Sequence, residues 1–323
     1  MNILFAGSPA PSAEVLRFIK ERTDHEIVGV ITQPDKRRKR GSLKVESDVS
    51  KMANTLSLKT FKPHRLDEDF KKDMLNISFD VLLVSAYGKI LPEWFLESPS
   101  KIAINIHYSL LPKYRGASPI QSVILNNEKK TGISFMKMSL GMDEGDILQS
   151  HELIIDKSWN KTQLESQLSA LSISKILSLL NQINNEELSY TKQDSNIATY
   201  CKKINKEDSL INFSTPSNEI LNKFKAFNEW PGISFIYKEK LIKIAEEGSF
   251  QLDMSYFDYA TGLTMTNKKF DALFGGPPRK PESELTQREM DLAASVQKVT
   301  EEIVVKLAKG IAKETRQKNL CLA

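Results

Sequence analysis

The sequence predicts an α/β protein built on an open, mostly parallel β-sheet, and two features of its first half indicate this class. Short apolar runs alternate with longer segments in which apolar residues recur every three or four positions. The short runs are apolar at almost every position, which is typical of strands buried on both faces of a parallel sheet. Ligands of such sheets bind beyond the carboxyl ends of the strands, so site residues are expected there.

The elements of the first half follow from local patterns. Ser118 followed by Pro119 is typical of a helix N-cap with proline at the first helical position. The motif Thr162–Glu165 has the spacing of a capping box and predicts the start of a helix whose apolar face includes Leu164 and Leu168. Five segments have the apolar content of strands: 2–6, 26–32, 80–86, 102–107 and 132–139.

A polar, asparagine-rich stretch at 181–200 separates this part of the chain from the rest. Because such a stretch lacks apolar periodicity, we expect a first domain over 1–185 and a linker over 186–204. A second, smaller domain is expected over 205–249. It contains a predicted helix near 217–227 and, after a Trp-Pro-Gly turn, two strand-like segments.

The composition changes again after about residue 250. Isoleucine occurs 26 times in residues 1–250 and twice in residues 251–323, so we treat 250–323 as a separate segment. Apolar residues spaced three or four apart predict an amphipathic helix over 292–311.

Composition excludes several classes of protein. Apolar residues make up 40% and charged residues 27% of the chain, which excludes global disorder. No run approaches the roughly 20 apolar residues that span a bilayer, and the N-terminus lacks the features of a signal peptide. The two cysteines, Cys201 and Cys321, are too few for a disulfide framework or a cysteine metal site. We therefore expect a cytoplasmic protein with no membrane attachment and no metal.

The net charge of +4 is small, but one segment is strongly basic. Five consecutive basic residues, Lys36, Arg37, Arg38, Lys39 and Arg40, are followed by Lys44, with no acidic residue among them. This pattern is compatible with a solvated loop and with an arm that contacts phosphates. The rest of the chain has to decide between these interpretations.

Three polar residues follow the ends of predicted strands. Asn105 and His107 lie two apart on one strand and therefore on one face. Asp143 lies in a glycine-flanked acidic turn after a later strand. An amide donor, an imidazole and a carboxylate suit acyl transfer to an amine, because they can stabilise an oxyanion, move a proton and orient the imidazole. The alternative is a structural histidine at a strand end and an ordinary turn aspartate.

Several motifs carry a family resemblance. The run NIHYSLLPKYRGASPIQ (105–121) and the motif MDEGDI (142–147) resemble the folate-dependent formyltransferases. The motifs FAGSP, GVITQPDK, AYGKILP, TGISFMKM, ATYCKKI and KAFNEWPG match the methionyl-tRNA branch of that family in the same order. The resemblance covers about residues 1–247. It implies a Rossmann-like formyltransferase fold followed by a small β-barrel domain, which here is incomplete.

The resemblance also implies roles for individual residues. It makes Asn105, His107 and Asp143 the catalytic trio, and 10-formyltetrahydrofolate the formyl donor, as a co-substrate. The acceptor is the amino group of methionyl initiator tRNA, attacked directly without a covalent enzyme intermediate, and the protein is expected to be a monomer. Folate binding is implied for Ile90, Leu91, Pro92, Ser109, Leu110, Leu111 and Pro112, and tRNA binding for Arg37, Arg38, Lys39, Arg40 and Lys44.

Residues from about 250 onwards resemble a fragment of a nodulation-type O-carbamoyltransferase. We interpret this as a chimeric join between two unrelated reading frames, with a genuine fusion as the alternative. The truncated barrel leaves two other functions open for the first part, a sugar-nucleotide N-formyltransferase and an inactive RNA-binding remnant. The neighbours of the trio leave a further alternative, because Tyr114 and Arg115 can either face the substrate or brace their loop.

Overall fold

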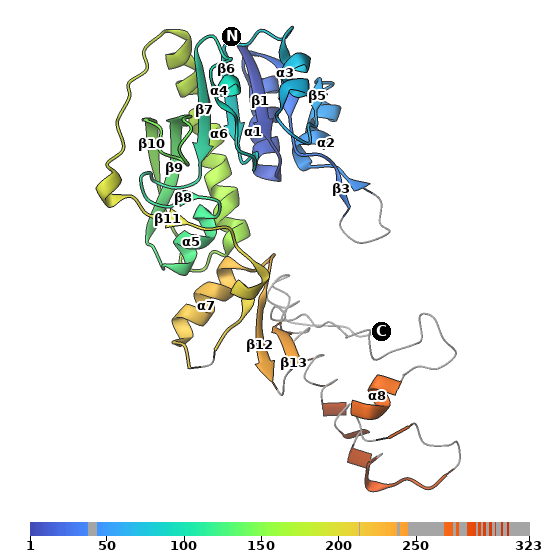
Figure 1. Cartoon of the computed structure of the whole chain (residues 1–323). Helices are drawn as coiled ribbons and strands as arrows, with labels where there is room; N and C mark the ends of the chain where they lie inside the picture. Colours follow the sequence, from blue (N-terminus) through green and yellow to red (C-terminus); the bar gives the residue numbers. More distant parts are fainter. Residues whose placement is uncertain are drawn as a thin grey trace. The chain divides into compact units, whose positions relative to one another are not determined.

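The chain forms two compact units, Met1–Leu241 and Ile242–Ala323, and the predicted site residues lie in the first (Figure 1). The computed structural model describes residues 1–37, 44–212, 214–237 and 240–244, then 268–273 and short stretches up to residue 309 (276–277, 283–288, 290–291, 293–294, 297–298, 301, 305 and 309). The apolar positions that predict a helix over 292–311 lie outside the described residues; these positions are Leu292, Val296, Val299, Ile303, Leu307 and Ile311. The described residues of this range, 293–294, 297–298, 301, 305 and 309, are helical.

The first unit is built around a seven-stranded sheet. Its strands are β1 (Asn2–Gly7), β2 (Glu26–Ile31), β5 (Thr60–Phe61), β6 (Val81–Ser85), β7 (Ile102–His107), β9 (Lys130–Lys137) and β10 (Ile147–Ile154). Their order across the sheet is β10-β9-β7-β6-β1-β2-β5. The pairs from β7 through β6, β1 and β2 to β5 are parallel, whereas β9 and β10 add antiparallel strands beyond β7. This confirms the predicted open, mostly parallel sheet.

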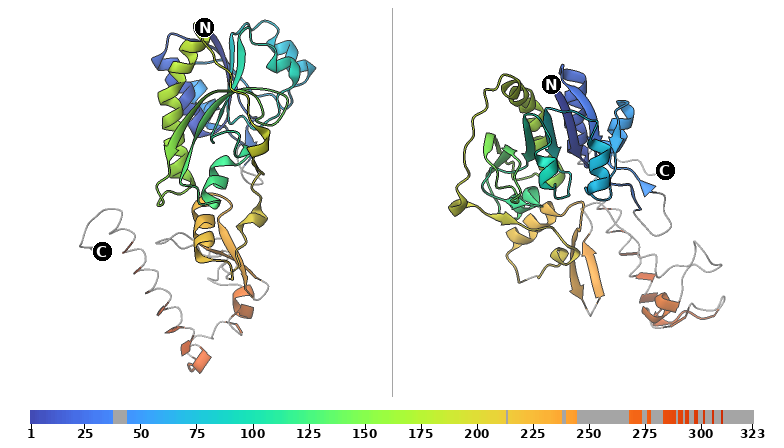
Figure 2. Two further views of the ribbon diagram at one scale, coloured as in Figure 1. Left: turned by 90° about the vertical axis from the view of Figure 1, so that its left-hand side faces the viewer. Right: turned by 45° about the horizontal axis from the view of Figure 1, so that its top comes forward.

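Helices cover both faces of the sheet (Figure 2). They are α1 (Ala10–Arg22), α2 (Asp48–Thr55), α3 (Glu68–Met74), α4 (Glu93–Leu96), α5 (Pro119–Leu125) and α6 (Lys161–Asn184). α1 packs with α6 on one face, and α3 and α4 insert Phe70 and Phe95 against Leu4 and Leu82 on the other. Burial on both faces explains why β1 and β6 are continuously apolar.

The start of α6 corrects one prediction. The capping box is formed by Asn160 and Gln163, not by Thr162 and Glu165. The Asn160 side chain accepts from the Gln163 N–H at 3.0 Å, and the Gln163 side chain accepts from the Asn160 N–H at 2.9 Å. Thr162 already lies inside the helix, and its hydroxyl accepts a hydrogen bond from the amide of Asn228. The start predicted at Ser118 and Pro119 is confirmed as that of α5.

The remaining elements are short. Two-residue strands form the pairs β3 (Lys36–Arg37) with β4 (Lys44–Val45) and β8 (Arg115–Gly116) with β11 (Tyr200–Cys201). The 3-10 helices η1 (Ser195–Ile197) and η2 (Lys206–Ser209) precede α7 (Ser217–Ala226), the paired strands β12 (Ile233–Tyr237) and β13 (Lys240–Ile244), and α8 (Lys268–Leu273). No helix in the described part of the chain has the length and apolar content needed to cross a membrane.

Candidate active site

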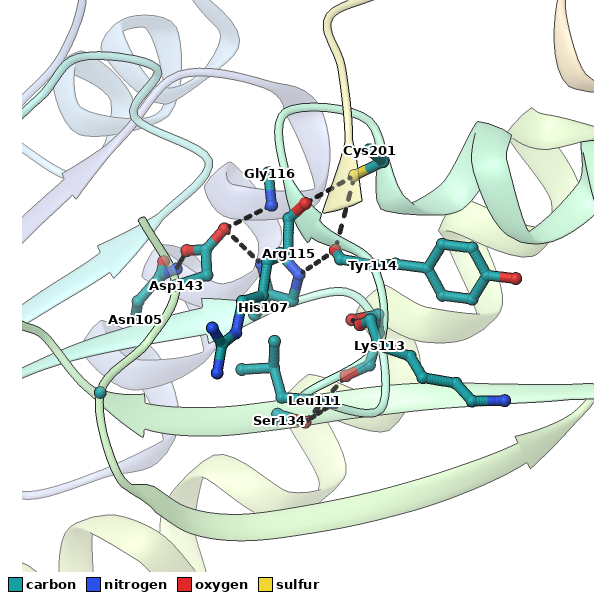
Figure 3. A network of polar contacts seen from close by, with 12 residues as sticks. Asn105, His107, Leu111, Lys113, Tyr114, Arg115, Gly116, Ser134, Asp143 and Cys201 are labelled. Carbon is teal, nitrogen blue, oxygen red and sulfur yellow. Dashed lines mark hydrogen bonds and ion pairs between the residues drawn. The ribbon is translucent and has the colours of Figure 1, made fainter. Parts of the chain in front are cut away.

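The three residues predicted as a catalytic trio converge at the carboxyl end of β7 (Figure 3). The Asn105 amide nitrogen donates to Asp143 Oδ1 at 3.4 Å. Asp143 Oδ2 lies 3.6 Å from Nδ1 of His107. Both strand residues face the same side because side chains alternate along β7. The strand end and the acidic turn therefore bring an amide, an imidazole and a carboxylate together.

The loop that carries Asp143, residues 139–146, approaches other backbone closely. Asp143 has a φ of 53°, in the left-handed region that few non-glycine residues adopt. The Gly116 N–H donates to Asp143 Oδ2 at 2.8 Å. A Cβ added at Gly145 would lie 1.8 Å from the carbonyl oxygen of Lys137, so only glycine fits there. Gly145, two residues after Asp143, therefore allows the acidic loop to pack closely against the end of β9.

The His107 ring is held at both nitrogens. Nε2 lies 2.9 Å from the carbonyl oxygen of Tyr114, and that oxygen can only accept. Nδ1 faces the Asp143 carboxylate. The ring can donate to both oxygens only when each nitrogen carries a proton, and His107 is almost completely buried at 5% exposure. The ring is therefore fixed in orientation between the Tyr114 carbonyl and the Asp143 carboxylate.

Asn105 keeps hydrogen-bonding capacity in the site. Within the described residues, Asp143 is the hydrogen-bond partner of its amide nitrogen. A primary amide has two N–H donors, so the second N–H is available to a ligand oxygen. A pre-positioned amide donor next to an imidazole is an arrangement that can stabilise negative charge on a carbonyl oxygen.

The predicted folate segment 109–112 follows β7 and is rigidly braced. The Ser134 hydroxyl links two points of this loop, accepting from the Leu111 N–H at 3.0 Å and donating to the Ser109 carbonyl at 2.8 Å. The Ser109 hydroxyl donates to the Lys113 carbonyl at 2.6 Å. Ser109 and Leu111 are buried, whereas Leu110 and Pro112 are half-buried. The two half-buried residues are therefore the ones accessible to a ligand.

The second predicted folate segment, Ile90–Pro92, follows β6, the strand next to β7. The Ile90 side chain is 89% exposed, while that of Leu91 is buried. The main-chain N–H and C=O of Leu91 make no hydrogen bond to any described residue. This segment therefore presents a free donor and a free acceptor close to the end of its strand.

Tyr114 and Arg115 brace the site. The Tyr114 hydroxyl donates to Glu128 at 2.7 Å. Burial, together with this carboxylate, raises the pKa of Tyr114 to about 12, so the phenol keeps its proton. Arg115 is only 1% exposed, and its guanidinium donates to the Gln193 side-chain oxygen at 3.0 Å and to the Tyr200 hydroxyl at 3.1 Å.

Cys201 completes the brace through its thiol. Its Sγ lies 3.5 Å from the Tyr114 carbonyl oxygen and 3.3 Å from that of Arg115. Burial raises the pKa of Cys201, so the group stays a thiol and can donate. This supports a structural role for Cys201.

The predicted tRNA-binding run lies in the connection between β3 and β4. Arg37 is in β3 and Lys44, which is exposed, is in β4. Lys62 ties the two ends of the connection, with its ammonium 2.8 Å from Asp35 and 2.9 Å from Glu46. Arg38, Lys39 and Arg40 lie outside the described residues.

Two residues of the site escape the sequence analysis. Gln193 and Tyr200 come from the stretch expected to be a polar linker, and both contact the buried guanidinium of Arg115. Local composition gives no signal for either residue, because their partners lie 78 and 85 positions away along the chain.

Two family models match the chain. The formyl transferase model covers residues 1–180, and the carbamoyltransferase N-terminus model covers residues 134–323. Both family models therefore match residues 134–180. These residues form the second half of β9, all of β10 and the larger part of α6, and β9 pairs directly with β7. The structure thus assigns the shared region to the formyl transferase sheet.

Individual proteins agree with the first match. The chain is 38% identical over 255 residues to methionyl-tRNA formyltransferase of Caldicellulosiruptor saccharolyticus, covering 78% of this chain and 81% of that protein. The methionyl-tRNA formyltransferase structure from Clostridium thermocellum has a TM-score of 0.55 at 18% identity, covering 78% of this chain and 94% of that one.

A third comparison involves a different acceptor. The N-formyltransferase of Helicobacter canadensis, solved with folinic acid and dTDP-3-aminofucose, has a TM-score of 0.56 at 20% identity, covering 73% of this chain and 84% of that one. At these identities the two solved structures show that the fold is shared. The chain therefore belongs to the formyl transferase family over its N-terminal half and to the carbamoyltransferase N-terminus family over its C-terminal part.

Proposed function

We propose that this chain transfers a formyl group from 10-formyltetrahydrofolate to the amino group of methionyl initiator tRNA. The observation that carries the proposal is the convergence of Asn105, His107 and Asp143 at the end of β7. The sequence relatives named methionyl-tRNA formyltransferase favour this acceptor.

The residues of the folate segments fit a pterin. The free N–H and C=O of Leu91 form a donor–acceptor pair, which is complementary to the amide edge of such a heterocycle. Ile90–Pro92 would hold the pterin through their main chain, and Ser109–Pro112 would line the same site. When bound, the folate supplies an activated formyl carbon.

The protein groups act on the charge and the proton that move during transfer. The amine forms a bond to the formyl carbon, the bond from this carbon to the folate N10 breaks, and one amine proton ends on N10. The free N–H of Asn105 donates to the formyl oxygen as negative charge develops there. His107, when protonated, donates to the same oxygen, and it can relay the proton. Asp143 holds the imidazole in orientation.

The basic run favours tRNA as the acceptor. Arg37, Arg38, Lys39, Arg40 and Lys44 would contact phosphates of the acceptor arm, with a binding energy that falls as salt rises. Lys62 pairs with Asp35 and Glu46, which flank this connection on its two sides.

A sugar-nucleotide N-formyltransferase is the second candidate, because the fold is shared with enzymes that carry an amino-sugar nucleotide. The experiment incubates the full chain with 10-formyltetrahydrofolate and either methionyl initiator tRNA or dTDP-3-aminofucose, and measures formylated product. We expect transfer to the tRNA, and a loss of about 10²–10⁴-fold in His107→Ala.

Replacing the five basic residues by Gln separates the two acceptors. Transfer to the tRNA should fall, whereas transfer to any small amine acceptor should not. A matched control replaces the exposed lysines Lys20 and Lys72, which lie on α1 and α3, and should leave transfer unchanged. Transfer to the sugar nucleotide alone would favour the second candidate, and transfer to neither would favour an inactive RNA-binding remnant.

We also propose that the segment from about residue 250 joins two unrelated sequences. The carbamoyltransferase match to residue 323 and the boundary of the second unit at Ile242 support this. Deleting residues 251–323 should therefore leave the rate of formyl transfer roughly unchanged. A large loss of rate on deletion would instead favour a genuine fusion.

A further inference from the structure

We propose that Gln193 is a positioning residue that holds the acidic loop, and with it Asp143, against His107. The inference rests on the proposed formyl transfer, in which Asp143 orients the imidazole. Gln193 lies 50 residues beyond Asp143 in the chain and outside the two site motifs, 105–121 and 142–147. It does not touch the reacting atoms, so its effect on the reaction has to pass through the loop.

The amide nitrogen of Gln193 donates hydrogen bonds to the main chain of the loop on both sides of Glu144, and this pair of bonds is called the grip below. It donates to the carbonyl oxygen of Asp143 at 2.9 Å and to that of Gly145 at 2.7 Å. Both bonds are to main-chain atoms, so they fix the path of the loop independently of its side chains. Gln193 itself is 8% exposed, which shields these bonds from competing water.

The amide oxygen of Gln193 anchors the grip to the body of the domain. It accepts from Nε of Arg115 at 3.0 Å. The same guanidinium donates to the Tyr200 hydroxyl at 3.1 Å and lies 3.6 Å from Glu144, a residue of the loop. Arg115 lies in β8, which pairs with β11 from a distant part of the chain. Gln193 is therefore attached to the folded body of the domain and not to the acidic loop itself.

The loop needs this grip because burial does not hold it. Its two large apolar side chains, Leu140 and Met142, are 66% and 61% exposed. Asp143 also adopts a left-handed φ of 53°, a strained conformation that the surrounding contacts have to hold. Beyond Gln193, main-chain atoms of the loop are held from outside by the Lys137 N–H, which donates to the Asp146 carbonyl at 2.8 Å. The other described contacts reach only its side chains: Asn105, Gly116 and His107 contact the Asp143 carboxylate, and Tyr200 and Arg115 contact Glu144.

Only a primary amide satisfies all three contacts at once. Two N–H groups meet two carbonyl oxygens, and one oxygen meets the Arg115 N–H. Glutamate in its place would still accept from Arg115 but would set a carboxylate against two carbonyl oxygens. Leucine would fill a similar volume and lose every contact.

The test uses the full chain with the variants Gln193→Leu and Gln193→Glu. Each is expected to lower kcat by about 10–100-fold, because a displacement of about 1 Å near a reacting group costs this much. KM for folate and for the tRNA should stay within about twofold, since neither variant removes a substrate contact. Gln149→Leu is the matched control. Gln149 lies on the edge strand β10, and its amide donates to the side chain of Gln182 in α6 at 2.7 Å. Loss of this bond should leave kcat unchanged.

A double-mutant cycle then separates positioning from general stability. In an Asp143→Asn background, Gln193→Leu should cost no more than about twofold in kcat, because the residue through which it acts is already impaired. Losses that multiply across the two substitutions, or an unchanged kcat in both Gln193 variants, would overturn the proposal.

Amide hydrogen exchange of residues 139–146 provides a readout that does not depend on activity. Exchange should accelerate in Gln193→Leu and stay at the wild-type rate in Gln149→Leu, with the rest of the sheet unaffected. Unchanged exchange in the loop would overturn the proposed grip. If the wild-type chain formylates no acceptor while the loop still opens in Gln193→Leu, the proposed function fails and the grip stands.

Discussion

The two sides of the site are built in opposite ways. On the acidic-loop side, Asn105, His107, Gly116 and Gln193 all hold Asp143 or its loop through bonds within the protein. On the other side, the loop 86–92 is tied from Tyr87 to Lys89 and left open at Ile90 and Leu91.

The open side has few internal bonds where a ligand would lie. The Tyr87 carbonyl accepts from the Gln33 amide at 2.9 Å, and the Lys89 ammonium donates to the His64 carbonyl at 2.9 Å. Ile90 is exposed, and the Leu91 main chain has no partner within the described residues.

This difference indicates a division of labour. Groups that handle charge and protons work best when they are fixed before the substrate arrives, because no reorganisation is then needed during the reaction. Groups that recognise a heterocycle must have unsatisfied donors and acceptors for it. Substitutions on the braced side should therefore lower kcat, and those on the open side should raise KM for folate.

The largest effect is expected for Asp143→Asn. The substitution keeps the shape of the side chain but removes the charge that faces His107 at 3.6 Å, and it leaves one acceptor oxygen for the two donors Asn105 and Gly116. We expect kcat to fall by about 10²–10³-fold at nearly constant KM, a loss within the range of general acid–base catalysis. Steady-state kinetics with both substrates measures this.

The control for this substitution is Asp156→Asn. Asp156 also accepts hydrogen bonds, from the Ser158 main chain at 2.8 Å and hydroxyl at 2.7 Å, but it lies in the exposed turn after β10. Its kcat should match the wild type. A fall in kcat of less than about threefold for Asp143→Asn would mean that the braced side is structural and not catalytic.

A smaller effect is expected for Gly88→Ala on the open side. Gly88 has a φ of 77°, and an added Cβ would lie 2.6 Å from the Gln33 amide nitrogen, the donor that ties this loop at Tyr87. Shifting the loop should raise KM for folate by about fivefold to tenfold, equivalent to about 1 kcal/mol, with kcat little changed.

Gly232→Ala is the matched control, because it separates backbone strain from displacement of the loop. Gly232 has nearly the same φ, 78°, but an added Cβ meets no atom within 4 Å. Both variants should lose about 1 kcal/mol of stability, and only Gly88→Ala should change KM. Equal KM values in the two variants would contradict a ligand-binding role for the open side.

The sequence supports the sheet better than it supports the site. Strands such as β1 and β6 are predictable because burial on both faces makes them continuously apolar. Asn105 and His107 are predictable because alternation along a strand fixes their common side. The family resemblance points to Asp143, whereas its distance from His107 depends on the close approach at Gly116 and Gly145.

The remaining features depend on tertiary contacts. Asn160 rather than Thr162 caps α6, since Asn160 forms the capping box with Gln163 while Thr162 accepts from Asn228 instead. Gln193 lies in a stretch whose polar composition is that of an ordinary linker. Its function as a brace exists only because β11 returns to β8 and brings Arg115 beside it.

The smallest expected effect concerns Cys201, whose thiol reports whether the braced side opens. Burial raises its pKa above the usual 9.0, and the residue is 7% exposed. At about pH 8 little thiolate forms, and alkylation requires the thiolate. Iodoacetamide should therefore modify the Cys201 peptide much more slowly in native buffer than in denaturant, as mass spectrometry can measure.

A cysteine on the open side gives the matched comparison. In Ile90→Cys, the new thiol replaces a side chain that is 89% exposed, and it should react nearly as fast as in denaturant. Because the folded state holds the Cys201 proton more tightly, this group stabilises the fold below pH 9.0, and its contribution is lost as pH rises above that value. Equal native reactivity at the two positions would mean that the braces around Tyr114 and Arg115 open as readily as the exposed loop, and the contrast between the two sides would fail.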